Sequence, residues 1–441
     1  MRAVRDGGSC RFADAGSPAE GPRMTASFKR ALPFIVLLAA VATTVLVMTV
    51  RLAPQLVFGL AMAVALAAAL AFHTPQEVAR RLLSALKAGL PFLAVLAIAF
   101  IAVLPFANEA GTHFSRGLQL LLVAAVLPLA SGLGALAGGP LGARERERWI
   151  IFFLAGLMVL IAGEIFLDDI RKIAIAFGYE RMSMSTLRMN RSTLVISLIA
   201  GFAFFRAVQS RDRVTLVAAM VTLFIMLAFS DNETARGIVL LTLLLALVPA
   251  RWSKGLYALT AIGTLAFILA GPFLYEPARE AWLSSSLAGF KPNTILARLD
   301  IWTLSARAVH AFGWLGGGID FLRDIDAYPD LVAAVAPLGE GAVMPDITYV
   351  LHSHNGALQL VVDLGLFGVI AAAALFVLLG RSIFSLPEPQ QSAYVRLVVL
   401  VLFAICVSHG LWQKWWWLAI GLVTLTVAFL GGADARRRQD D

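Results

Sequence analysis

The sequence predicts an all-α polytopic membrane protein with about twelve transmembrane helices. Its mean hydropathy is +0.82, and 59% of its 441 residues are hydrophobic while only 15% are charged. A soluble protein of this length could not bury so much apolar surface. Apolar runs also recur from residue 31 to residue 430, separated by short charged segments. Many of these runs approach the roughly 20 residues that one membrane crossing needs.

The apolar runs define the expected helices in chain order. The polar segment 1–30 shows no signal peptide with a cleavage site, so we expect the first run to act as its own insertion signal. The first nine spans occupy 31–275 and the last three occupy 357–430, followed by a cytoplasmic tail, 431–441. The twelve spans are 31–50, 55–72, 88–106, 118–138, 149–167, 193–209, 214–230, 237–250, 256–275, 357–379, 397–410 and 416–430.

Lysine and arginine predict the orientation of these helices. Cytoplasmic loops of membrane proteins are enriched in both residues. A cytoplasmic N-terminus puts most of them on that side, in the segments 1–30, 73–87, 139–148, 210–213, 251–255, 380–396 and 431–441. The net charge of +8 is then explained by topology, and no nucleic-acid partner is expected.

Two segments on the non-cytoplasmic side are too basic or too long to be simple connections between helices. The loop 168–192 is basic, although the rule disfavours basic residues on that side. The loop 276–356 is long and is expected to form a small helical domain, here called the outer domain. Its helix is expected to begin at Pro292 and to end before the glycine-rich stretch GWLGGG, 313–318.

Five basic side chains are expected to gather at this outer side. Arg191 and Arg236 stand at the mouths of the sixth and eighth spans, and Arg298 lies in the outer domain. His352 and His354 stand directly before the tenth span, in the stretch HSHN. Charged residues at that depth are costly unless they line a wet cavity or bind a ligand.

Arginine and histidine together suit one class of reaction. An arginine fork matches phosphate oxygens, so three of them could bind a diphosphate and stabilise it as it leaves. A neutral histidine can accept a proton from a hydroxyl. At a membrane surface, this favours transfer of a glycan from a polyprenyl diphosphate carrier to a sugar hydroxyl.

Structural roles are open for each of these residues. An arginine at a helix mouth often only fixes the orientation of the helix, with its aliphatic part in the apolar layer. A histidine directly before a helix often caps the first turn of that helix. Glu164 and Asp363, inside apolar runs, are interpreted as ion-pair partners of the arginines, with an acid–base role as the alternative.

The outer domain also contains an acidic stretch, RDIDAYPD, with Asp324, Asp326 and Asp330. Two aspartates one residue apart can bind a divalent metal on a sugar diphosphate. Acidic loops with proline are more often solvated surface, and the arginines would already supply positive charge. No metal or other cofactor is therefore expected.

Several motifs resemble the bacterial O-antigen ligase family, within the O-antigen ligase and polymerase superfamily. His354 and Asn355 are followed after nine residues by Gly365 and Gly368, which fits the family pattern H-N, nine residues, G-x-x-G. The stretches RLDIW and FGWLGGG are similar to the large periplasmic loop of these proteins. ETARG resembles their serine–arginine–glycine motif, with Ala235 in place of serine, and MNR resembles the arginine before the sixth span.

The resemblance implies a fold similar to GT-C-type glycosyltransferases in the bacterial inner membrane, with the active site facing the periplasm. It implies a metal-independent, inverting transfer from an undecaprenyl-diphosphate-linked glycan to lipid A–core, with both substrates and membrane lipid as partners. His354 would be the base, and Arg191, Arg236 and Arg298 would bind the diphosphate. Substrate contacts would come from His352, Asn355, Arg188 and Trp302.

Three other functions are compatible with parts of this pattern. An O-antigen polymerase or a protein O-oligosaccharyltransferase of the same superfamily would share the donor site and differ in the acceptor. A transporter or flippase is disfavoured, because transporters tend to place ionisable residues near the middle of the membrane.

Overall fold

The computed structural model of the chain describes residues 53–138, 189–230, 232–286, 288, 292–339, 342–408 and 410–431. Within these ranges the regular structure is helical throughout. Seven helices are long and apolar enough to cross a membrane. The described part of the chain therefore has the architecture of a multi-pass membrane protein.

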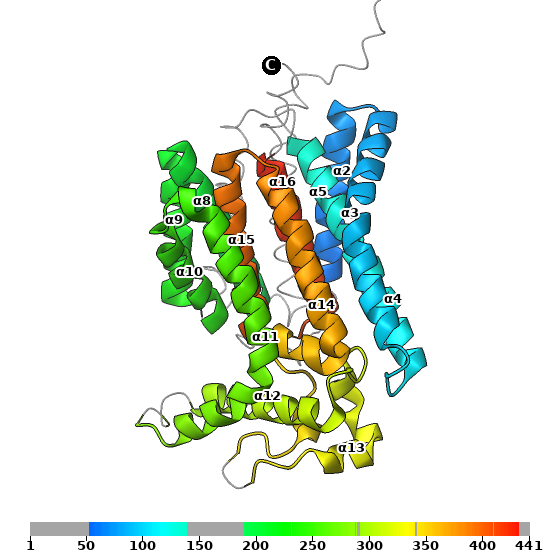
Figure 1. Cartoon of the computed structure of the whole chain (residues 1–441). Helices are drawn as coiled ribbons and strands as arrows, with labels where there is room; N and C mark the ends of the chain where they lie inside the picture. Colours follow the sequence, from blue (N-terminus) through cyan, green and yellow to red (C-terminus); the bar gives the residue numbers. More distant parts are fainter. Residues whose placement is uncertain are drawn as a thin grey trace, which may run out of the picture.

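Most helices form a bundle, and two lie outside it (Figure 1). The bundle helices are α2 (Ala53–Phe72), α3 (Pro75–Val103), α4 (Ala110–Ala124), α5 (Val126–Gly138), α8 (Met189–Ser210), α9 (Arg213–Phe229), α10 (Glu233–Ala246), α11 (Ser253–Leu283), α14 (Gly356–Phe384), α15 (Glu388–Val407) and α16 (Lys414–Gly431). The outer domain holds α12 (Pro292–Phe312) and α13 (Pro329–Ala334), with short 3₁₀ turns η2 (Phe321–Ala327) and η3 (Ile347–Tyr349).

Every predicted span within the described residues coincides with a helix, but those at 55–72, 214–230 and 237–250 fall on α2, α9 and α10, which are not among the seven helices long and apolar enough to cross a membrane. Spans 31–50 and 149–167 lie outside the described residues. The span predicted at 118–138 is interrupted, since α4 ends at Ala124 and α5 begins at Val126. The α11 helix continues to Leu283, past the predicted end at residue 275, and so enters the outer domain. The helix predicted from Pro292 ends at Phe312, directly before the glycine-rich stretch.

Polar residues cap the helices at the chain reversals. The Asp212 carboxylate accepts hydrogen bonds from Val214 N at 3.0 Å and Thr215 N at 3.2 Å, which starts α9. The Asn232 amide oxygen accepts from Thr234 N at 3.0 Å and from Ala235 N, which starts α10. Such caps satisfy backbone N–H groups that have no partner inside the helix. Short capped connections make α8, α9 and α10 antiparallel neighbours.

Small residues let the helices approach closely. A Cβ on Gly134 of α5 would lie 3.0 Å from the Ala428 Cβ of α16, and one on Gly138 would lie 2.9 Å from the Phe429 carbonyl carbon. Close packing through small residues is typical of membrane helices, because lipid gives no hydrophobic drive for their association. The α5–α16 pair therefore joins the first helices of the bundle to the last one.

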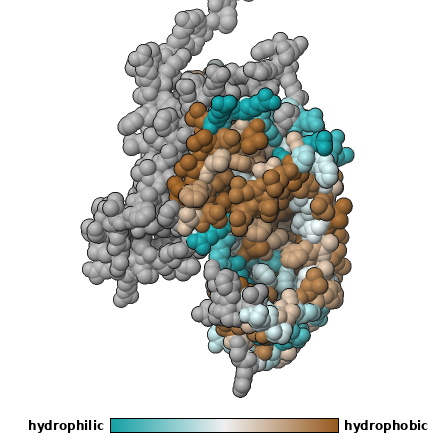
Figure 2. Space-filling view, turned by 90° about the vertical axis from the view of Figure 1, so that its left-hand side faces the viewer, coloured by the Kyte–Doolittle hydropathy of each residue, from teal (hydrophilic) through white to brown (hydrophobic). Residues whose placement is uncertain are grey.

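The surface of the bundle is apolar where lipid would meet it. Figure 2 shows a broad apolar band, with hydrophilic residues at its upper edge and a more hydrophilic surface below. On α9, Val217 and Phe224 are 59% and 67% exposed, and on α10, Leu244 is 62% exposed. The helices α12 and α13 lie across one end of the bundle, here called the outer end (Figure 1).

Candidate active site

The two histidines precede α14 at the outer end, and Asn355 determines where this helix begins. The Asn355 side-chain oxygen accepts a hydrogen bond from Leu358 N at 3.1 Å, as an N-cap. Its amide nitrogen donates to the Tyr275 hydroxyl of α11 at 2.7 Å. Asn355 is fully buried. Both ends of the amide therefore hold protein groups, which favours positioning of the adjacent histidine over direct substrate contact.

His354 has a left-handed backbone conformation, and one of its ring nitrogens is hydrogen-bonded to the protein. Its φ is +50°, a left-handed conformation that residues with a Cβ rarely adopt. Its Nδ1 lies 3.1 Å from the Ser408 carbonyl oxygen at the end of α15. Because a carbonyl only accepts, the proton of the neutral ring lies on Nδ1. The lone pair is therefore on Nε2, which is the nitrogen available to act as a base.

His352 packs directly beside His354. The two ring centroids are 4.2 Å apart, with an interplanar angle of 41°. His352 Nε2 lies 3.0 Å from the Gln413 side-chain nitrogen. Its Nδ1 is buried and has no hydrogen-bond partner among the described residues. Buried polar atoms usually have such partners, so this atom is a candidate contact for a ligand.

Both histidines are neutral near pH 7. Burial lowers the pKa of His354 below its usual value, as does the positive charge of Arg298, while the bond to Ser408 opposes the change. Burial also lowers the pKa of His352 to about 4, with smaller effects from His354 and Arg323. A neutral His354 can accept a proton at physiological pH.

Arg298 and Arg236 carry charges that the described protein leaves uncompensated. Arg298, on α12, is half-buried, and its charge reaches His354. It makes no hydrogen bond or ion pair with the described residues. Arg236 lies in the first turn of α10, and its Nε is buried without a partner in the described part of the chain. Such arginines are suited to bind an anion.

Helix register puts Arg236 at the same end as His354. The Arg396 guanidinium of α15 donates to Leu245 O at 3.1 Å and also to Val248 O, beyond the C-terminus of α10. A Cβ on Gly237, near the start of α10, would meet the Phe403 ring of α15 at 2.7 Å. The two helices are therefore antiparallel, and the start of α10 lies toward the end of α15, where Ser408 binds His354.

The other predicted arginines are only partly described. Arg191 lies in the first turn of α8, and since α8 runs parallel to α10, its backbone is at the outer end too. The Arg191 side chain and all of Arg188 lie outside the described residues.

Trp302, predicted as a substrate contact, packs inside the outer domain. Its ring lies 5.4 Å from the Tyr275 ring, centroid to centroid. The indole nitrogen is buried and has no hydrogen-bond partner among the described residues. Trp302 thus supports Tyr275, which in turn holds Asn355.

The glycine motif joins α14 to the outer domain. Gly365 breaks α14 with φ +56° and ψ −143°. At this break the Gly317 and Gly318 N–H groups donate to Val362 O and Asp363 O, each at 2.9 Å, and Leu366 N donates to Trp314 O at 2.9 Å. The pattern H-N, nine residues, G-x-x-G therefore links the histidines to the point where the GWLGGG turn docks.

Asp363 does not pair with the described arginines. Its Oδ2 accepts hydrogen bonds from the Trp412 indole and from Asp320 N. The interpretation of Asp363 as an ion-pair partner is therefore wrong for the described residues, because the docked outer domain and the 410–413 loop supply neutral donors instead. Glu164 lies outside the described residues.

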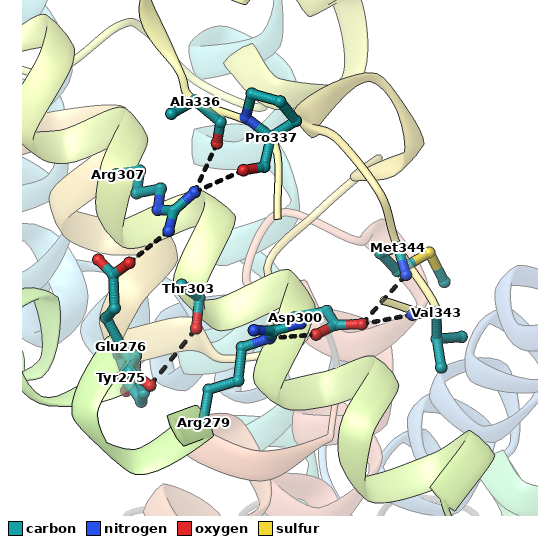
Figure 3. Close-up of polar contacts among 10 residues, drawn as sticks. All are labelled: Tyr275, Glu276, Arg279, Asp300, Thr303, Arg307, Ala336, Pro337, Val343 and Met344. Carbon is teal, nitrogen blue, oxygen red and sulfur yellow. Dashed lines mark hydrogen bonds and ion pairs between the residues drawn. The ribbon is translucent and has the colours of Figure 1, made fainter. Parts of the chain in front are cut away.

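Asp300 is a residue that the motifs did not single out, and it anchors the outer domain (Figure 3). It is fully buried in α12. Its carboxylate pairs with Arg279 at 2.6 Å and accepts from Val343 N at 2.7 Å and Met344 N at 3.1 Å. An aspartate inside the apolar stretch RLDIW was the available signal, since a buried charge needs partners.

The acidic stretch is partly occupied by an ion pair. The Asp324 carboxylate lies 2.6 Å from the Arg116 guanidinium of α4. The same guanidinium donates to Ile319 O and Asp320 O, each at 3.2 Å. Asp326 and Asp330 are exposed. Asp324 thus ties the outer domain to α4, and this ion pair gives the aspartate a structural role.

Neither known protein families nor curated protein sequences show a match to this chain.

Proposed function

We propose that the chain is an O-antigen ligase, which transfers a glycan from undecaprenyl diphosphate to a sugar hydroxyl of lipid A–core. The observation that carries the proposal is a neutral His354, with Nε2 free to accept a proton, within range of the Arg298 charge. Both residues stand at the outer end of an apolar bundle, where lipid-linked head groups would meet.

The proposed reaction is a single displacement at the anomeric carbon of the donor glycan. His354 Nε2 takes the proton of the acceptor hydroxyl, and that oxygen attacks the anomeric carbon of the donor glycan. The bond from this carbon to the diphosphate oxygen breaks, and attack from the opposite side inverts the configuration. Arg298 and Arg236, with Arg191, would compensate the charge that grows on the leaving diphosphate. Fixed cations can supply this charge without a metal.

The proposed reaction implies the bacterial inner membrane, and the charge distribution supports an orientation there with the outer end in the periplasm. Four basic residues lie at the opposite end of the bundle, where the chain turns from α8 into α9 and from α10 into α11: Arg211, Arg213, Arg251 and Lys254. This is the cytoplasmic side if the positive-inside rule applies.

The test uses purified protein with an undecaprenyl-diphosphate-linked glycan. Lipid A–core or a second carrier-linked glycan is added in separate reactions, and the products are resolved on a gel. Glycan on lipid A–core is the expected result. A lengthening carrier-linked ladder would identify a polymerase instead, and glycan on an added acceptor protein would identify an O-oligosaccharyltransferase. Transfer to none of these by folded protein would overturn the proposal.

A further inference from the structure

A glutamine and a tryptophan at the start of α16 lie behind the histidine pair. The Trp415 indole nitrogen donates to the Gln413 side-chain oxygen at 2.6 Å. An indole N–H can only donate, so the atom of Gln413 that faces it is the oxygen. The amide nitrogen therefore faces His352 Nε2, at 3.0 Å.

This contact determines which nitrogen of His352 carries the proton. An amide NH₂ only donates, so His352 Nε2 must accept with its lone pair. The neutral ring then has its proton on Nδ1, the buried atom without a partner among the described residues. A doubly protonated ring would turn a second donor toward the amide, so the contact also disfavours the charged form.

The packing around His352 keeps this contact in place. The loop before α16 lies against the ring, because a Cβ on Gly410 would come within 3.0 Å of His352 Cδ2. The charged and titratable groups near His352 are His354 and Arg323. Arg323 only donates, and His354 makes no hydrogen bond with His352 Nδ1, which is without a partner in the described part of the chain.

We infer that Gln413, oriented by Trp415, is a positioning residue that holds His352 as a neutral hydrogen-bond donor. His352 Nδ1–H then binds an oxygen of the acceptor sugar next to the hydroxyl that the neighbouring His354 deprotonates. The identity of this ligand rests on the proposed function, whereas the protonation of the ring does not. The site thus presents a base and a neutral donor side by side, on rings 4.2 Å apart.

Three variants test the role of Gln413. In Gln413→Glu, a carboxylate that only accepts would face His352 Nε2, move the proton to that nitrogen and raise the pKa of the ring. Trp415→Phe removes the indole donor, so the amide is free to rotate. The matched control is Trp417→Phe, because the Trp417 indole donates to Leu411 O at 2.9 Å and not to Gln413.

The first measurement needs no substrate. Histidine ¹⁵N spectra of the full chain in lipid nanodiscs, with His352 assigned by its loss in His352→Gln, report which ring nitrogen is protonated. We expect protonated Nδ1 and unprotonated Nε2 in the wild type and in Trp417→Phe. Protonated Nε2 is expected in Gln413→Glu, and a mixture of both forms in Trp415→Phe. Protonated Nε2 in the wild type, or an unchanged spectrum in Gln413→Glu, would overturn the inference.

The second measurement uses the transfer assay. Gln413→Glu is expected to raise KM for the acceptor about tenfold, the equivalent of about one hydrogen bond, with little change in kcat or in KM for the donor. A rise confined to the donor KM would overturn the binding role of His352. Absence of transfer in the wild type would instead refute the ligase proposal, and the spectra would still decide the role of Gln413.

Discussion

Replacing Gly365 by alanine tests the joint between α14 and the outer domain. The φ of +56° and ψ of −143° lie close to a region that only glycine adopts readily, which costs other residues about 1–3 kcal/mol. The added Cβ would also lie 2.6 Å from the Leu315 carbonyl carbon and 2.7 Å from Gly316 N, and it would overlap Trp314 O. Relief of this overlap would strain the three hydrogen bonds of the joint, each worth about 0.5–1.5 kcal/mol.

These contributions predict that Gly365→Ala loses about 3–7 kcal/mol of stability. Thermal unfolding of purified protein would measure the loss, and proteolysis of the outer domain would locate it. Gly263→Ala is the matched control, because a Cβ there in α11 meets nothing within 4 Å, so that change should be neutral or slightly stabilising. Equal unfolding temperatures for the two variants would refute the described joint.

Four further predictions concern the site and its support. His354→Ala should lower transfer about 10²–10⁴-fold while loss of the bond to Ser408 costs only about 0.5–1.5 kcal/mol of stability, and near-normal transfer would exclude His354 as the base. Because the base is neutral above its pKa, and burial lowers the pKa of His354 below 6.5, transfer should reach half its maximum only at a pH below 6.5; a half-maximal rate at or above pH 6.5 would contradict this. Asp300→Asn should destabilise by about 3–5 kcal/mol, as expected when one partner of a buried ion pair is removed, while the exposed Asp330→Asn should change stability by less than about 0.5 kcal/mol. Transfer should be unchanged by EDTA and by Asp326→Ala, and a loss reversed by added divalent cation would show that a metal takes part.

Sequence reasoning predicted the helical class, and most helix positions in the described ranges, from hydropathy alone. Sequence reasoning located the ends and interruptions of the helices less accurately than their positions. The interruption between α4 and α5 left no mark in hydropathy, because apolar residues continue through it. The α11 helix instead continues into the polar stretch EPARE, 276–280, where hydropathy marks the end of a membrane span but not the end of a helix. Hydropathy shows that a segment can enter lipid but not where its helix breaks: Pro128 has no N–H to donate to the carbonyl of Ala124, the last residue of α4.

The motifs indicated which residues belong to the candidate site, but not what each one does. Asn355 stood in the motif as a substrate contact, while its burial and its bonds to Leu358 and Tyr275 favour a structural role. Gln413 and Trp415 belong to no motif that was recognised. Their role comes from a contact across 61 residues of chain, which no local pattern contains.

By itself, the sequence determined that this chain is a helical membrane protein with basic and histidine side chains grouped near helix mouths. Hydropathy and residue type are local properties, and these conclusions depend on nothing else. Only the tertiary structure decided which histidine nitrogen is free, which arginine charge reaches it, and why Gly365 must be glycine. Each of these depends on a partner brought near by folding: Ser408 for His354, α12 for Arg298, and the GWLGGG turn for α14.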